Sequence, residues 1–187
     1  SDQFIATNAD QALYNLREFG VTLCRGFSKK EDLDILFYKT FKLLKDPNIL
    51  GSNGFYIKNP QTRFLEGLLV DKIILNILLN KTIIDICENY IGDQILLQEI
   101  FVKQDIGSNL NYFDIHRHRE DGLRKSIYFD KPFSIGFILY THDTEEGAFL
   151  YAPKSHKSET YYGSDLNDYP SEIKQTIKDN LTRMNGK

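Results

Sequence analysis

Apolar residues near the start of the chain recur three and four positions apart. This spacing over residues 8–19 predicts a helix with Asn8 as its N-cap and Gly20 as its stop. Residues 21–27 are apolar and β-branched, which favours a short buried strand. We therefore expect a helix and a strand that pack together at the beginning of the fold.

A second helix is expected directly after this strand. Ser28 and Glu31 have the spacing of a capping box, and the apolar stripe behind them predicts a helix that stops before Pro47. Residues 47–62 are rich in turn-forming residues and predict a loop, with a short extended piece at 55–57.

The helical period returns at residues 64–91 and then gives way to a period of two. Two apolar stripes predict helix over 64–91, and Gly92 closes it. A last helix is expected from Ser171, behind Pro170, to about residue 183. The strands predicted by the period of two are 95–103, 111–120, 133–141 and 148–151.

The order of these elements predicts the fold class. Helices occupy about 1–93, strands about 94–157 and a last helix about 171–183, so the chain does not alternate strand and helix. This order favours a single α+β domain over 1–187, with helices packed on an antiparallel sandwich or barrel.

Composition narrows the class of protein. With 41% hydrophobic and 26% charged residues, the 187-residue chain has the balance of a globular protein, which argues against disorder. The net charge of −3 gives no broad basic field, so we expect neither nucleic acid nor a membrane surface as partner. Cys24 and Cys87 predict buried, reduced thiols. Without a signal peptide or membrane span, we expect a cytoplasmic protein.

The first candidate for chemistry is the triplet His118-Arg119-Glu120. On a strand, positions i and i+2 face the same side, so His118 and Glu120 present one imidazole and one carboxylate to the same ion. A further histidine would complete the facial triad of non-haem Fe(II) oxygenases. His116 shares this face and is the alternative ligand for either position.

The second candidate is the segment 143–157, which ends in Pro153-Lys-Ser-His156-Lys157. It resembles a block of the phytanoyl-CoA dioxygenase family, an Fe(II)- and 2-oxoglutarate-dependent family in which an Asn-Gly pair precedes Pro-Gly-Ser-His-Lys. Here Glu146 stands in place of the Asn and Lys154 in place of the second Gly. Residues 16–27 and 96–103 are also similar to the family's opening and to the strand before its metal motif, and His118-Arg119-Glu120 takes the place of its His-x-Asp.

The resemblance implies a double-stranded β-helix, a jelly-roll barrel flanked by N-terminal helices. It implies Fe(II) as cofactor, 2-oxoglutarate as cosubstrate, molecular oxygen and a small-molecule substrate that is hydroxylated. His118 and Glu120 would hold the metal, and His156 would be structural, tying its turn to the barrel mouth. Lys103 is a candidate partner for a cosubstrate carboxylate, although a lysine at a strand end is more often solvated.

One part of the family's pattern is not found in this sequence. The family's distal His and its 2-oxoglutarate-binding Arg follow on a later strand, whereas no histidine follows His156 here, and Arg183 falls in the predicted last helix. We expect the chain to be a piece that lacks the last strands. Two alternatives remain open: His156 or His142 is recruited as the third ligand, or the domain is a catalytically inactive jelly-roll binding module.

Overall fold

The computed structural model describes nine parts of the chain, and everything below refers to them: 2–45, 55–59, 62–66, 72–96, 101–105, 135–136, 138, 149–157 and 170–184. The helices are η1 (Asp2–Phe4), α1 (Ala9–Phe19), α2 (Lys30–Lys45), α3 (Lys72–Leu78), α4 (Lys81–Ile91), η2 (Ser155–Lys157) and α5 (Ser171–Asp179). The strands are β1 (Ile5–Ala6), β2 (Leu23–Cys24), β3 (Phe55–Asn59), β4 (Thr62–Glu66), β5 (Phe101–Asp105), β6 (Phe149–Tyr151) and β7 (Thr182–Met184).

Helix α1 has the predicted boundaries. Its N-cap Asn8 accepts a hydrogen bond on Oδ1 from the backbone N–H of Gln11 at 2.9 Å. At its other end Gly20 takes the left-handed conformation, with φ of 77°, and donates its N–H to the carbonyl of Leu16. Both caps satisfy backbone groups that the helix itself leaves unpaired, which explains why the local sequence was sufficient to predict them.

A hydrogen bond from the buried side chain of Asn15 holds the N-terminal segment against α1. β1 pairs in parallel with β2, and the side chain of Asn15 in α1 donates to the carbonyl of Phe4 at 3.0 Å. Asn15 is only 3% exposed, so this bond satisfies an amide that would otherwise be costly to bury. The predicted strand over 21–27 is confirmed in its centre only, because β2 spans two residues.

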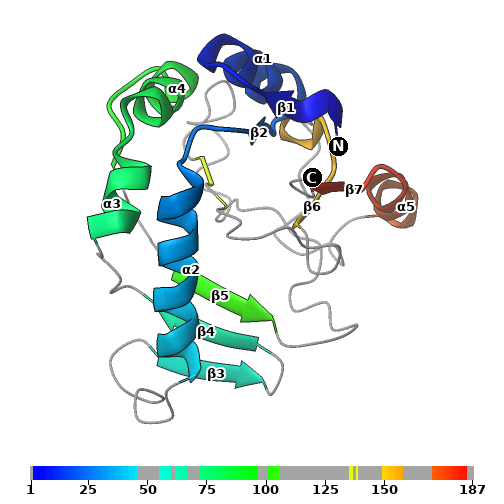
Figure 1. Ribbon diagram of the computed structural model, residues 1–187. Coiled ribbons are helices and arrows are strands. Elements are labelled where there is room, and N and C mark those ends of the chain that lie inside the picture. Colours follow the sequence, from blue (N-terminus) through cyan, green and yellow to red (C-terminus); the bar gives the residue numbers. More distant parts are fainter. Residues whose placement is uncertain are drawn as a thin grey trace.

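A three-stranded antiparallel sheet, in the order β3-β4-β5, corrects the predicted start of the third helix. Residues 62–66 form β4 and not helix, and each of them pairs with a residue of β5. β4 pairs with β3 just before it and with β5 about 40 residues further along the chain, so strand pairing on both sides overrides the helix predicted from residue 64. Helix α2 passes over this sheet (Figure 1). It begins at Lys30, one residue later than the predicted capping box would place it, and ends at Lys45 as predicted.

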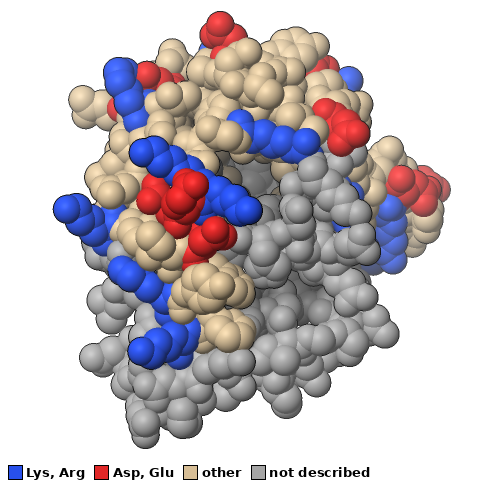
Figure 2. All heavy atoms as spheres, in the orientation of Figure 1, with Lys and Arg blue, Asp and Glu red and all other residues tan. Residues whose placement is uncertain are grey.

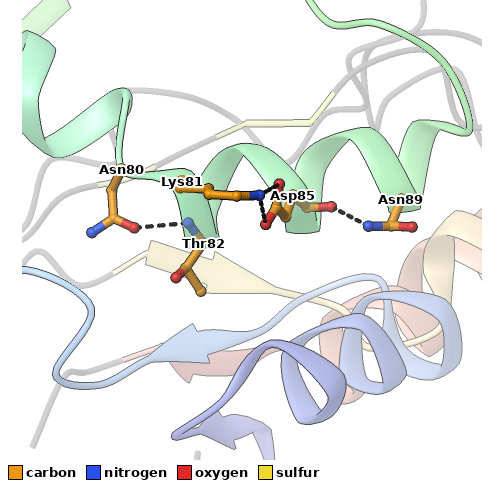
Figure 3. Close-up of polar contacts among 5 residues, drawn as sticks. All are labelled: Asn80, Lys81, Thr82, Asp85 and Asn89. Atoms are coloured by element: carbon orange, nitrogen blue, oxygen red, sulfur yellow. Dashed lines mark hydrogen bonds and ion pairs between the residues drawn. The ribbon is translucent and has the colours of Figure 1, made fainter.

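The predicted helix up to residue 91 is divided into α3 and α4. Asn80 caps the second helix: its Oδ1 accepts from the N–H of Thr82 at 2.9 Å (Figure 3). Its Nδ2 donates to the carbonyl of Phe27 at 3.2 Å, which links the break to the segment before α2. Gly92 ends α4 in the left-handed conformation, as predicted.

The C-terminal helix is shorter than predicted. α5 begins at Ser171 behind Pro170, as expected, but ends at Asp179, and residues 182–184 form β7. Arg183 therefore lies in a strand and not in a helix. β7 pairs antiparallel with β6, whose residues 149–151 confirm the last predicted strand.

Two apolar clusters form the core of the described part. The first joins α1, β1 and α4, and the second joins α2 and α3, so apolar positions of the predicted helices are buried here. The fully or largely buried residues of the two clusters are Ala6, Ala12, Leu16 and Ile86 in the first, and Leu36 and Ile77 in the second.

The predicted jelly-roll barrel stays a prediction. The described strands form three separate small sheets, and most of the predicted barrel segment lies outside the described residues. β5 starts at Phe101, later than predicted. Of the strand expected over 133–141, only residues 135, 136 and 138 are described, and none of these three lies in a strand. Within the described ranges, no helix combines the length and apolar character needed to cross a membrane.

Candidate functional site

The predicted metal ligands lie outside the described residues. His116, His118 and Glu120 all fall within 106–134. The backbone of Lys103 is described in β5, where it pairs with Phe64 of β4. In the part of the chain that the structure describes, no three His, Cys, Asp or Glu side chains gather in a way that would hold a metal ion. The iron site at His116, His118 and Glu120 stays a prediction from the sequence.

The second candidate segment lies within the described part of the chain at residues 149–157. A β-turn over 152–155 follows β6 and is closed by a hydrogen bond from Ser155 N–H to the carbonyl of Ala152 at 3.1 Å. Lys154, the third residue of this turn, has a φ of 68°. Proline at the second position and a positive φ at the third are the signature of a type II turn, which normally requires glycine at the third position.

This turn, continuing into η2, docks on the C-terminal end of α1. Lys154 donates its backbone N–H to the carbonyl of Phe19 at 2.8 Å. The Nε2 atom of His156 lies 3.2 Å from the carbonyl oxygen of Arg17. In Figure 1 the short orange turn of η2 lies beside α1, although the two are far apart in the sequence. The end of α1, with its unpaired carbonyls, thus finds donors in the turn.

Gly20 permits this close approach. A Cβ atom on Gly20 would collide with the imidazole of His156 and with the hydroxyl of Tyr151. The absence of a side chain at residue 20 therefore serves two purposes: it allows the positive φ of the helix cap and admits the two rings. The structural role predicted for His156 agrees with these contacts, whereas its position at a barrel mouth stays a prediction.

A single carboxylate joins both lysines of the motif to α1. Glu18 lies 3.1 Å from Nζ of Lys154 and 2.9 Å from Nζ of Lys157. The hydrogen bond from Lys157, followed by that from Lys154, lowers the pKa of the Glu18 carboxyl below its ordinary value. Lys154 also places its ammonium 5.7 Å from the centre of the Phe19 ring, within range of a cation–π contact.

The C-terminal end of α1, on which the turn docks, also contacts α4. Arg17 donates to the carbonyl of Asn89 at 3.2 Å, and α1 packs on α4 in the first apolar cluster. Burial raises the pKa of Tyr90 at this contact, and the neighbouring Tyr151 adds to the effect. Burial likewise raises the pKa of Cys24 and of Cys87, which are free thiols, and so favours their protonated form.

The β-turn and η2, residues 152–157, fix the end of β6 to the end of α1. The turn contributes the backbone N–H of Lys154, two ammonium groups and the imidazole of His156, and the carboxylate that pairs with the ammonium groups belongs to Glu18 of α1. The sequence indicated His156 and the Gly20 cap, but neither their contact nor the pairing of Glu18 with Lys154 and Lys157 was predicted. The only available signal was the lysine in place of the motif's glycine, because partners 139 residues apart leave no periodic trace.

Comparison of the whole chain with protein-family models, with curated proteins and with solved structures gives no match in any of the three. The resemblance to phytanoyl-CoA dioxygenases therefore stays a prediction that rests on the sequence motif.

Proposed function

We propose that this chain is an Fe(II)- and 2-oxoglutarate-dependent oxygenase of the phytanoyl-CoA dioxygenase type, built on a jelly-roll barrel with N-terminal helices. Its reaction is the hydroxylation of a small molecule by molecular oxygen. The cytoplasmic location expected from the sequence belongs to the same proposal, and the two free thiols fit a reducing compartment.

The observation that carries the proposal is the backbone of Lys154. The motif of the family has glycine at this position, and the chain adopts there a positive φ that favours glycine. For an L-residue with a Cβ, the left-handed conformation costs roughly 1–2 kcal/mol. Sequence resemblance and backbone conformation thus point independently to the same turn, which supports reading residues 153–157 as the family's motif.

The donor set of the predicted site fits ferrous iron. His118 and His116 supply imidazole nitrogens and Glu120 supplies a carboxylate, the ligand types of a facial triad. Bound iron with 2-oxoglutarate would supply the oxidising chemistry. In the proposal, His118 and Glu120 hold the metal, with His116 as the substitute for either, and Lys103 pairs with a carboxylate of the cosubstrate.

The test is an anaerobic titration of the protein encoded by the complete reading frame with Fe(II) and 2-oxoglutarate. We expect a visible charge-transfer band only when both are present. Glu120→Asp, which restores the family's usual residue, should keep the band, whereas Glu120→Gln should abolish it. Asp85→Asn on α4, outside the predicted site, is the control that should leave the band unchanged.

Absence of the band in a folded wild-type protein would contradict the proposal. The chain would then fit the alternative of a catalytically inactive jelly-roll binding module. A band that survives Glu120→Gln would contradict the assignment of Glu120 and would favour His116 and His118 as the ligand pair.

A further inference from the structure

The turn formed by residues 152–157, called here the docked turn, has little apolar anchorage. None of its six residues is buried, and Lys154 and Lys157 are exposed. Among the described residues, the apolar cluster beneath α1 draws its members from other segments. A segment with few buried apolar contacts and exposed hydrogen bonds belongs to the low-stability end of a fold, where local opening occurs without global unfolding.

Polar contacts to α1 must therefore hold the docked turn in place. Two of them are made to backbone carbonyls, by the N–H of Lys154 and by the ring of His156. Two further contacts converge on one side chain, since Glu18 pairs with Lys154 and with Lys157. Loss of Glu18 removes both ion pairs at once, whereas loss of either lysine removes one.

We propose that Glu18, Lys154 and Lys157 form an ion-pair latch that controls local opening of the docked turn from the end of α1. The latch connects Glu18 with Lys157, which lies 139 positions further along the chain. This inference does not depend on the proposed enzymatic activity, because it uses only contacts between described residues.

Lys154 affects the latch in two opposite ways, through its backbone and through its side chain. Glycine at this place would adopt the turn without strain. Lysine adopts it at a cost but adds an ion pair to Glu18 and a cation–π contact to Phe19. A residue that is unfavourable for the backbone is thus compensated by contacts that only a long cationic side chain can make.

The ion pairs of the latch are exposed to solvent, so salt should weaken them. The Glu18 side chain is 35% exposed and the two lysines are more so. Figure 2 shows basic and acidic side chains interspersed on the described part of one face of the protein. Exposed pairs of this kind are weakened as the screening length falls to about 3 Å at 1 M salt.

Amide hydrogen exchange measures the opening directly. The N–H of Lys154 is bonded across the contact to the carbonyl of Phe19, so its exchange rate reports undocking. The N–H of Gly20, bonded to Leu16 within α1, reports the integrity of the helix end itself. In Glu18→Gln at neutral pH and low salt, we expect the Lys154 amide to exchange about three- to tenfold faster, with the Gly20 amide unchanged within about twofold.

Three comparisons make the test decisive. Lys157→Gln should accelerate the Lys154 amide less than Glu18→Gln does, because one ion pair remains. Addition of 1 M NaCl should bring the wild-type rate close to that of Glu18→Gln. Asp85→Asn removes the exposed Lys81–Asp85 pair within α4 (Figure 3) and should leave the Lys154 amide at the wild-type rate.

The inference is overturned if Glu18→Gln leaves the Lys154 amide at the wild-type rate. It is equally overturned if the Gly20 and Lys154 amides accelerate together, because Glu18 would then stabilise the helix end and not the contact. A wild-type rate that does not respond to salt would also exclude an ion-pair latch.

Discussion

Gly20 is the residue on which the contact between α1 and the docked turn depends most directly. Replacement by alanine adds a methyl group against the ring of His156 and the hydroxyl of Tyr151, in a backbone conformation that already disfavours a side chain. We expect Gly20→Ala to lower the free energy of unfolding by about 2–4 kcal/mol, combining strain and overpacking. Urea denaturation followed by circular dichroism measures it.

Gly26 provides the matched control for this prediction. Its φ of 74° is close to that of Gly20, but a Cβ on Gly26 would meet nothing within 4 Å. Gly26→Ala should therefore cost only the backbone term, about 1–2 kcal/mol. Equal losses in the two variants would mean that the contact with His156 and Tyr151 contributes nothing to stability.

Glu18 should make the stability of the protein depend on pH. Its pKa is lowered in the folded state by the hydrogen bonds from Lys157 and Lys154. The stabilisation is therefore fully present above the ordinary carboxyl pKa and is lost as the pH falls through the folded value. We expect wild type to unfold at higher urea than Glu18→Gln at pH 7, and the difference to vanish in strong acid.

The decisive quantity for Glu18 is the difference between the two unfolding midpoints across the pH range. Other carboxylates titrate in both proteins and cancel in this difference. A difference that is constant from pH 7 to pH 2 would show that the charge of Glu18 has no part in holding the docked turn.

At the level of secondary-structure elements, Asn80 separates α3 from α4. Its Oδ1 caps α4 and its Nδ2 binds the carbonyl of Phe27. Asn80→Ala should lower the free energy of unfolding by about 1–2 kcal/mol, since both contacts are lost. Asn80→Asp keeps the cap acceptor and loses only the donor, so its loss should be smaller. Equal losses would assign all of the effect to the Phe27 contact, and thermal or urea unfolding distinguishes the two.

Elements with local signals were predictable from the sequence, and elements with distant partners were not. α1 was predicted from its spacing, Asn8 and Gly20, all of which act within a few residues. β4 and β7 were missed because their strand character depends on pairing with other strands, β3 and β5 for β4 and β6 for β7. The predicted helices extended over both places, and strand pairing replaces helix there.

The same distinction explains how much of the candidate site could be predicted. The docked turn was recognised from Pro153 and His156, because a motif preserves the local turn chemistry. Its partners Glu18 and Gly20 belong to a helix end that the sequence marks only as a cap. Hydrogen bonds between residues more than 130 positions apart have no signature in a single sequence, so the docking itself could not be foreseen.

At the scale of the whole molecule, the described part divides into a helical scaffold and a strand segment that docks on it. α1 and α4 form a shared apolar cluster, and β6 with its turn reaches the end of α1 through polar contacts. In the proposed enzyme this arrangement separates two tasks. Residues 116–120 would hold the metal, and residues 153–157 fix a strand to the scaffold.

The measurement that tests this separation most directly compares two histidine variants. Fe(II) and 2-oxoglutarate are titrated anaerobically into His118→Ala and His156→Ala, and urea unfolding is recorded for both. We predict that His118→Ala loses the charge-transfer band with near-wild-type stability, whereas His156→Ala keeps the band but unfolds at lower urea. The reverse pattern, with the band lost in a folded His156→Ala and kept in His118→Ala, would contradict the account.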